Sequence, residues 1–300
     1  MARESWTEAS RVGGKPTKSL TVLLRTRGCS YAKRQGPCRF CAFHGFAEKN
    51  PKELGPDKLR AKVEGVIAAH DFEAEGIGEL KIYNGGSFFA DAEIRPKERE
   101  AVLSVIARHR LRKLSVEARP EHVARKKILE AREALGLMEL EVAMGLETSD
   151  DALRSRLNKG FMLVDFYNAA WVLAECGATL GAYVLIKPVP MSEEEARADA
   201  LSSLDYLSGL RERLGLNISA RLEPFSLYKG MEAEPGHSPA SLATVIRIIK
   251  EAPDNLDLFL GCSEGEAALS EGAAALEMGR MKNAVDLFNS TGDRRAFEAR

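Results

Sequence analysis

Short apolar runs alternate along the chain with longer segments whose apolar residues recur at helical spacing. The short runs are near-continuously apolar, as expected for strands of a parallel sheet that is buried on both faces. They lie at residues 20–24, 80–83, 114–117, 140–144, 179–186, 218–222 and 256–260. Between them, helical periodicity predicts helices over residues 56–70, 96–109, 121–135, 163–176, 192–213 and 239–251.

Helix-start signals support several of these boundaries. Pro96 and Pro239 suit a first helical turn, and Ser192 with Glu195 forms a potential capping box. Parallel strands joined by helices are typical of a partial or full α/β barrel or of an open doubly wound sheet. In each of these folds, ligands bind at the C-terminal ends of the strands. We expect a polar N-terminal segment over residues 1–18, one domain over 19–262 and a helical C-terminal cap over 263–300.

Composition narrows the class of protein. The chain has 300 residues, 45% of them hydrophobic and 29% charged, which excludes a disordered or collagen-like protein. No apolar run approaches the ~20 residues that a membrane helix needs, and residues 1–18 lack the apolar core of a secretion signal. We therefore expect a cytoplasmic protein without membrane contact. The net charge of −1 gives no overall attraction to nucleic acid.

Three of the five cysteines lie within thirteen residues, directly after the first strand. Cys29, Cys38 and Cys41 have the spacing C-x8-C-x2-C, which favours a metal or redox site over a disulfide framework. Three thiolates can hold three corners of a 4Fe-4S cluster and leave one iron open to a ligand. A structural zinc site that includes His44, or three buried thiols without metal, are the alternatives. Cys176 and Cys262 stand alone and are expected to be buried thiols.

Polar and glycine residues follow the later strands, where a barrel places its chemistry. Each has a structural alternative: the glycines form a loop, and the charged residues cap helices or form ion pairs. The candidates are Asn84, Gly85, Gly86 and Ser87 after the second strand, Glu117 and Arg119 at the third, Glu147, Thr148 and Lys159 after the fourth, Lys187 after the fifth, and Arg221 and Glu223 in the sixth.

Several of these segments resemble the radical S-adenosylmethionine (SAM) superfamily. Phe40 directly precedes the last cysteine of the cluster loop, as an aromatic residue does in that superfamily. The eight-residue cysteine spacing is similar to the branch that contains the elongator catalytic subunit and the archaeosine synthase radical SAM subunit (RaSEA). Further similar segments are GSF at residues 86–88, VEARPE at 116–121, LETSDD at 146–151 and NKGF at 158–161.

The resemblance implies a partial (β/α)6-type TIM barrel of the radical SAM kind with a short helical C-terminal extension. It implies a 4Fe-4S cluster on Cys29, Cys38 and Cys41, with SAM as the second cofactor. The SAM-binding residues would be Asn84, Gly85, Gly86, Ser87, Glu117, Glu147, Thr148, Lys159 and Lys187. Arg119, Arg221 and Glu223 would lie toward the substrate.

The implied activity is reductive cleavage of SAM to a 5′-deoxyadenosyl radical that abstracts hydrogen from a substrate. An electron donor such as flavodoxin or ferredoxin would supply the electron. A RaSEA-like reaction would break a C–N bond of a lysine-modified deazaguanine in tRNA, alongside a lysine-transferring partner enzyme. A radical SAM enzyme acting on a small metabolite or peptide is the alternative within the class. A zinc-bearing Cys3His binding protein is the alternative outside it.

Overall fold

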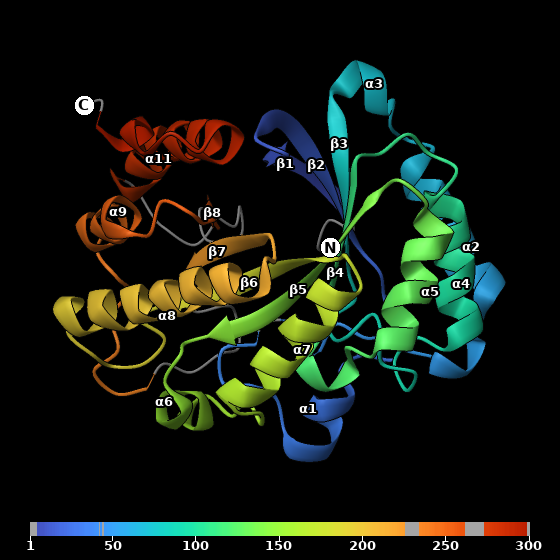
Figure 1. The fold of residues 1–300 in the computed structure, drawn as a ribbon, viewed down its shortest axis with the longest axis horizontal. Helices are drawn as coiled ribbons and strands as arrows, with labels where there is room; N and C mark the ends of the chain where they lie inside the picture. The colour runs from blue at the N-terminus through green and yellow to red at the C-terminus, as the bar shows by residue number, and fades with distance from the viewer. Residues whose placement is uncertain (1–4, 42, 44, 226–233, 262–272, 299–300) are drawn as a thin grey trace.

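The computed structural model describes residues 5–41, 43, 45–225, 234–261 and 273–298 (Figure 1). Eight strands form one sheet in which spatial order follows chain order. The first two strands are antiparallel, and the second to the eighth are parallel. They are β1 (Ser5–Val12), β2 (Lys15–Leu23), β3 (Ile77–Tyr83), β4 (Lys113–Glu117), β5 (Glu139–Glu147), β6 (Thr179–Ile186), β7 (Ile218–Pro224) and β8 (Asp257–Leu260). All seven strands predicted from the sequence are present.

Helices pack around the curled sheet, and the fold is the α/β partial barrel that the sequence predicted (Figure 1). The main helices are α2 (Pro56–Ile67), α4 (Pro96–Ile106), α5 (Arg125–Leu135), α7 (Leu163–Glu175), α8 (Glu193–Leu214), α9 (Leu242–Glu251) and the C-terminal α11 (Ala273–Thr291). Shorter elements are α1 (Ser30–Gln35), η1 (Pro51–Glu53), α3 (Phe72–Glu75), η2 (Pro120–His122), α6 (Asp151–Arg156) and η3 (Arg294–Phe297). Within the described residues, no helix is long and apolar enough to cross a membrane.

Two helix starts differ from expectation, and two are confirmed. The helix expected over 121–135 is divided into η2 and α5, and α9 begins after Ser241 rather than at Pro239. The Ser241 hydroxyl accepts from the backbone N–H of Thr244 at 3.2 Å, and this cap sets the later start. Pro96 lies in the first turn of α4, and Ser192 with Glu195 forms the expected capping box of α8.

The strands are not apolar on both faces, which corrects the reading of them as near-continuously apolar. Residues that face the helices are buried aliphatic side chains, among them Leu80, Ile82, Leu114, Val116, Leu140 and Val142. The alternate positions face the barrel interior and include Lys81, Ser115, Glu141, Ser219 and Arg221. The barrel therefore has an apolar outer layer and a polar interior.

Residues 5–12 form β1 at one edge of the sheet, within the span 1–18 for which a polar N-terminal segment was predicted. Arg11 of β1 explains how this edge is held. Its guanidinium donates to backbone carbonyls of β8 and of α11, pairs with Asp257, and lies 4.1 Å from the centre of the Phe259 ring. The two edges of the sheet are thus joined by a buried side chain, and α11 packs against β1, β2 and β8.

Candidate functional site

A cavity of about 740 Å³ lies inside the barrel and extends to the C-terminal strand ends. This volume is in the range of small-molecule and cofactor sites. The three clustered cysteines line it together with residues that are far apart in the sequence. Of the predicted site residues, the lining includes Cys29, Cys38, Cys41, Gly85, Gly86, Glu117, Arg119, Glu147, Lys159, Arg221 and Glu223.

The cysteine loop presents three free thiols to the cavity. Cys29 caps α1, whose Ala32 N–H lies 3.4 Å from its sulfur, and the Cys41 N–H donates to the Cys38 carbonyl at 3.0 Å. Burial raises the pKa of the Cys41 thiol to about 11 and also raises the pKa of Cys29. Because thiolates are the metal ligands, binding of a metal centre here must displace protons.

The thiols share a wall of the cavity, but they do not form a finished ligand set. Among the described residues, no group of three or more His, Cys, Asp or Glu side chains is placed to hold a metal ion. His44, the fourth ligand of the zinc alternative, lies outside the described residues, as does Cys262. Cys176 is buried at the end of α7, as expected for an isolated thiol.

Glu93, which the sequence analysis missed, ties the cysteine loop to the glycine-rich end of β3. Its buried carboxylate accepts from the Ser30 N–H at 2.7 Å, the Ser30 hydroxyl at 2.8 Å and the Ser87 N–H at 2.5 Å. A Cβ added to Gly86 would lie 2.0 Å from Glu93 Oε2 and 3.1 Å from the Cα of Cys29. Glycine at position 86 therefore allows the close approach of the two segments.

Asn84 and Ser87 belong to the same strand end but lie outside the cavity lining. The Ser87 hydroxyl accepts from the Arg119 N–H at 3.0 Å, so it joins the ends of β3 and β4. The amide group of Asn84 is fully buried and has no hydrogen-bond partner within the described residues. Buried amides rarely stay unpaired, so this group is suited to a polar ligand or a water molecule.

Glu147 and Lys159 form a buried ion pair in the cavity wall, with 2.5 Å between the Lys159 Nζ and the carboxylate. Burial lowers the pKa of Lys159, but the negative charge of Glu147 and the nearby Cys38 outweigh it and raise the pKa. Lys159 is therefore a cation facing the cysteine loop, and it lies 5.1 Å from the centre of the Phe40 ring. A Cβ at Gly145 would lie 2.0 Å from Glu147 Oε1 and 2.4 Å from Lys159 Nζ, so a glycine makes room for the pair.

Arg119 connects the end of β4 to both neighbouring segments of the site. Its guanidinium lies 3.9 Å from the centre of the Tyr31 ring in α1 and donates to the Lys159 carbonyl at 2.8 Å. Gly160 has a positive φ of 70°, and a Cβ there would lie 2.3 Å from the Tyr31 ring. Arg119 and Gly160 together fix the position of α1 directly after Cys29.

Two further predicted residues, Thr148 and Lys187, also lie outside the cavity lining. The Thr148 hydroxyl donates to Asp199 at 2.6 Å and accepts from the Asp150 N–H at 3.0 Å, next to the N-cap of α6. Lys187 pairs with Glu193 at 2.5 Å and donates to the Ser238 hydroxyl at 3.0 Å. Both side chains therefore have structural partners outside the cavity lining.

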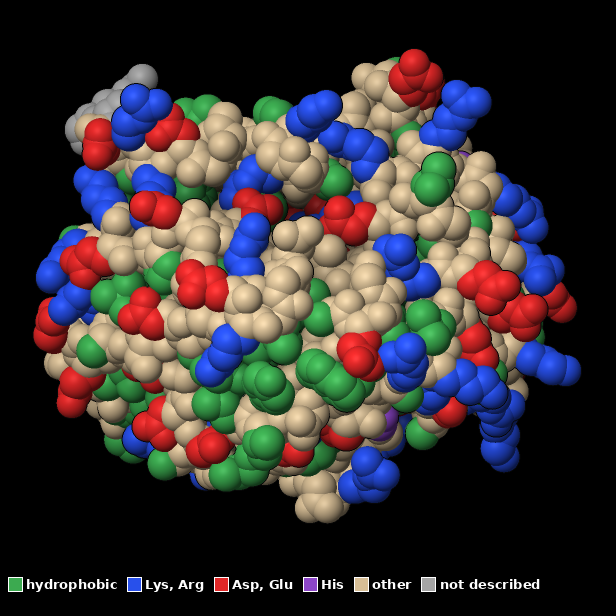
Figure 2. All heavy atoms as spheres, viewed as in Figure 1, with side chains coloured by type: hydrophobic (Ala, Val, Ile, Leu, Met, Phe, Trp, Pro, Cys, Tyr) green, Lys and Arg blue, Asp and Glu red, His purple; other side chains and the backbone are tan. Residues whose placement is uncertain are grey.

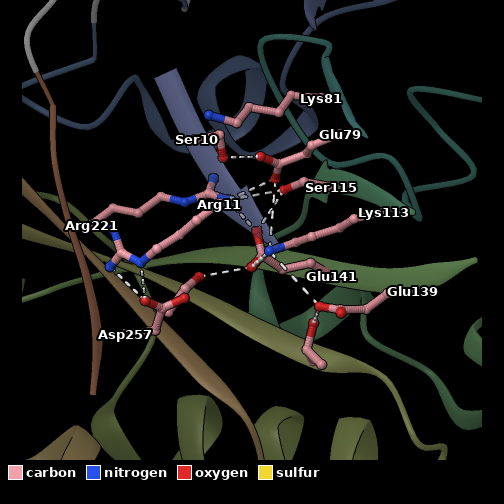
Figure 3. Close-up of polar contacts among 12 residues, drawn as sticks. Ser10, Arg11, Glu79, Lys81, Lys113, Ser115, Glu139, Glu141, Arg221 and Asp257 are labelled. Carbon is pink, nitrogen blue, oxygen red and sulfur yellow. Dashed lines mark hydrogen bonds and ion pairs between the residues drawn. The ribbon is translucent and has the colours of Figure 1, made fainter. Parts of the chain in front are cut away.

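A network of fixed charges centred on Glu141 lies in the barrel interior, and two of its members, Glu79 and Arg221, line the cavity (Figure 3). The Glu141 carboxylate accepts from Lys113 at 2.5 Å, Ser219 at 2.7 Å, Ser115 at 2.8 Å and also from Arg221. Burial opposes ionisation of Glu141, but the two cations outweigh it and hold its pKa far below the usual range. The pKa values of Lys113 and Arg221 are raised in turn, so all three groups stay charged.

Two residues of this network were not predicted from the sequence: Lys113 as an interior residue, and Glu141 altogether. The available signal was the alternation of polar and apolar residues within each strand, which places Lys113, Ser115 and Glu117 on one face of β4. Arg221, predicted as a substrate-side residue, is buried in this network while its guanidinium still lines the cavity.

Comparisons with known proteins agree with this fold. No protein-family model matches the chain. The archaeosine synthase subunit beta of Methanosarcina acetivorans is 30% identical over 252 residues, which are 83% of this chain and 70% of that protein. A crystal structure of methylornithine synthase (PylB) matches with a TM-score of 0.56 at 15% identity, over 81% of this chain and 63% of that one. The Elp3 of Methanocaldococcus infernus, with its N-terminus deleted, matches with a TM-score of 0.52 at 14% identity, over 75% and 58%.

Proposed function

The chain belongs to the family of archaeosine synthase subunit beta, the radical SAM branch that its motifs indicate, and on this premise we propose that it is a radical SAM enzyme. The observation that carries the proposal is one cavity lined by Cys29, Cys38 and Cys41, by the glycine pair at the end of β3, and by the ion pair of Glu147 and Lys159. These groups come from three different strand ends, and the fold brings them together at the edge where barrels place their chemistry.

The residues present suit a 4Fe-4S cluster and SAM. Cys29, Cys38 and Cys41 supply three thiolates. A cubane cluster has four irons, so one iron would have no protein thiolate. Lys159 is a buried cation for a carboxylate, and Glu147 is an acceptor for hydroxyl or amino groups. Gly85 and Gly86 leave backbone accessible at the cavity wall. When bound, the two cofactors supply a 5′-deoxyadenosyl radical that takes hydrogen from a substrate.

The chain's own residues position the cofactors and limit access of water. The rings of Phe40, Tyr31 and Phe161 lie against the cations Lys159 and Arg119, and Phe40 and Phe161 line the cavity beside the cysteine loop. An apolar and aromatic wall removes water, which strengthens the charged contacts and protects a reactive radical from quenching. An electron donor such as flavodoxin or ferredoxin completes the proposed system.

For the substrate we propose a lysine-modified deazaguanine in tRNA, because the curated relative is named an archaeosine synthase subunit. The proposed reaction breaks a C–N bond of that nucleoside, and a lysine-transferring enzyme acts as the partner. A small metabolite or peptide is the second candidate. It is favoured by the pairing of Arg27 with Glu98 and of Arg39 with Glu234 near the cluster loop, and by the mixture of both charge signs on the face in Figure 2.

The test is anaerobic reconstitution with iron and sulfide, followed by EPR with and without SAM and an assay for 5′-deoxyadenosine. We expect a cluster signal that SAM perturbs and 5′-deoxyadenosine formation. Both should be lost in Cys38→Ala and retained in Cys176→Ala, which removes a buried thiol outside the cavity lining. Stoichiometric zinc without a SAM-dependent signal would refute the proposal. Product formation on modified tRNA, but not on the free modified nucleoside, would favour the tRNA substrate over the small-molecule candidate.

A further inference from the structure

Glu117, at the end of β4, differs from the carboxylates of the barrel interior that are paired with cations. Glu79, Glu141 and Glu147 each have at least one cation within 4.0 Å. Among the described residues, Glu117 has none, although its side chain lines the cavity together with the three cysteines. A carboxyl without a paired cation, facing a site rather than solvent, is suited to exchange a proton.

The hydrogen bonds of Glu117 accommodate both of its protonation states. The Tyr183 hydroxyl lies 3.3 Å from Glu117 Oε1 and 3.0 Å from the Tyr83 hydroxyl, and Arg221 Nη1 donates to both phenol oxygens, at 3.1 and 3.3 Å. A hydroxyl carries one proton and accepts through two lone pairs. When Glu117 is ionised, Tyr183 donates to it. When Glu117 is protonated, its own O–H donates to Tyr183, which then donates to Tyr83.

The groups around Glu117 keep it titratable while they stay in one state themselves. Burial raises the pKa of Glu117 to about 7, and the charge of Glu147 adds to this. Arg221, the Tyr183 hydrogen bond and Lys159 oppose the rise without cancelling it. Burial also raises the pKa values of Tyr83 and Tyr183, so both phenols stay neutral at physiological pH. The groups that face Glu117 are therefore Tyr83 of β3, Glu147 of β5, Tyr183 of β6, Arg221 of β7 and Lys159 after α6.

We propose that Glu117 is a catalytic acid–base residue that exchanges a proton with a nitrogen or oxygen atom of the substrate, and that Tyr183 positions its carboxyl. This assignment rests on the proposed function. In this step the O–H bond of Glu117 breaks and an N–H or O–H bond forms through a lone pair of the substrate atom, while the O–H electron pair stays on Glu117 as a carboxylate. Water returns the proton after product release, so this step needs no oxidant or reductant.

A direct test uses the cofactor-free protein. Infrared difference spectra or carbon NMR of 13C-glutamate-labelled protein across pH 4 to 9 should show one carboxyl that titrates near pH 7. The signal should vanish in Glu117→Gln and persist in Glu133→Gln, the same substitution on the exposed face of α5. Tyr183→Phe should move the midpoint upward, because it removes a hydrogen bond that favours the ionised form. A Glu117 carboxyl that titrates near 4.5 overturns the proposal.

A second test measures turnover of lysine-modified tRNA by the reconstituted enzyme. Proton transfer by a positioned side chain typically contributes about 10²- to 10⁴-fold, so Glu117→Gln should lower kcat for product at least ~100-fold at pH 7 and abolish the pH dependence near 7. Glu117→Asp should recover part of the rate. A variant with an unchanged kcat and a raised KM for SAM would instead make Glu117 a cofactor contact. A wild-type enzyme that forms no 5′-deoxyadenosine refutes the proposed function, and the titration then still decides whether Glu117 carries the exchangeable proton.

Discussion

Replacing Glu141 with glutamine tests whether the charge network in the barrel interior stabilises the fold. The side chain of Glu141 is 1% exposed and accepts hydrogen bonds from two cations and two serines. Glutamine keeps the shape but leaves Lys113 and Arg221 with Glu79 as their remaining interior carboxylate, at 3.7 and 3.9 Å. Removing one partner of a buried ion pair typically costs about 3–5 kcal/mol. We expect a loss of this size in the free energy of unfolding.

Urea denaturation at several pH values provides the assay. The folded-state pKa of Glu141 is depressed, so its stabilisation is present above the unfolded value near 4.5 and is lost as the pH falls toward the folded value. The gap between wild type and Glu141→Gln should therefore be constant from pH 6 to 8 and shrink below about pH 4.5. Glu139→Gln, on the same strand but 35% exposed, should cost no more than ~1 kcal/mol. A loss below ~1 kcal/mol for Glu141→Gln as well would refute the reasoning.

Three further predictions concern Arg11 between the edges of the sheet, Gly160 beside Tyr31, and the carboxyl of Glu117 in the cavity. Arg11→Met removes the donors to three backbone carbonyls and should destabilise the protein by about 3 kcal/mol and speed hydrogen exchange in α11 more than in α5. Gly160→Ala should lower the melting temperature more than Gly177→Ala, because both have positive φ but only the first would meet the Tyr31 ring; equal shifts would contradict this. Glu117→Gln should gain up to about 3 kcal/mol over wild type in urea denaturation at pH 8.5 and nothing at pH 4, because ionising a carboxyl whose pKa is raised costs folding energy above its unfolded value; a constant difference would contradict this.

The apolar pattern and the cysteine spacing determined much of the fold and the position of the site. Aliphatic residues of each strand face the helices, and this one-sided burial was strong enough to locate all seven parallel strands. The order of strand and helix then led to a barrel with its site at the C-terminal strand ends. The cysteine loop and the glycine pair of β3 were found because they stand next to those ends in the chain, and Lys159 was found through the resemblance of the segment around it.

The tertiary structure decided what depends on contacts between distant segments. Glu93 joins the cysteine loop to β3, Arg11 joins β1 to β8, and Glu141 collects donors from β4 and β7, and no local pattern marks any of the three. A buried charge is tolerated only where partners from other strands satisfy it, so its role cannot be read from its own neighbours in sequence. The same reason separates Glu117 from Glu147. Both residues end buried strands, but the fold places the Lys159 cation beside Glu147 and the Tyr183 phenol beside Glu117.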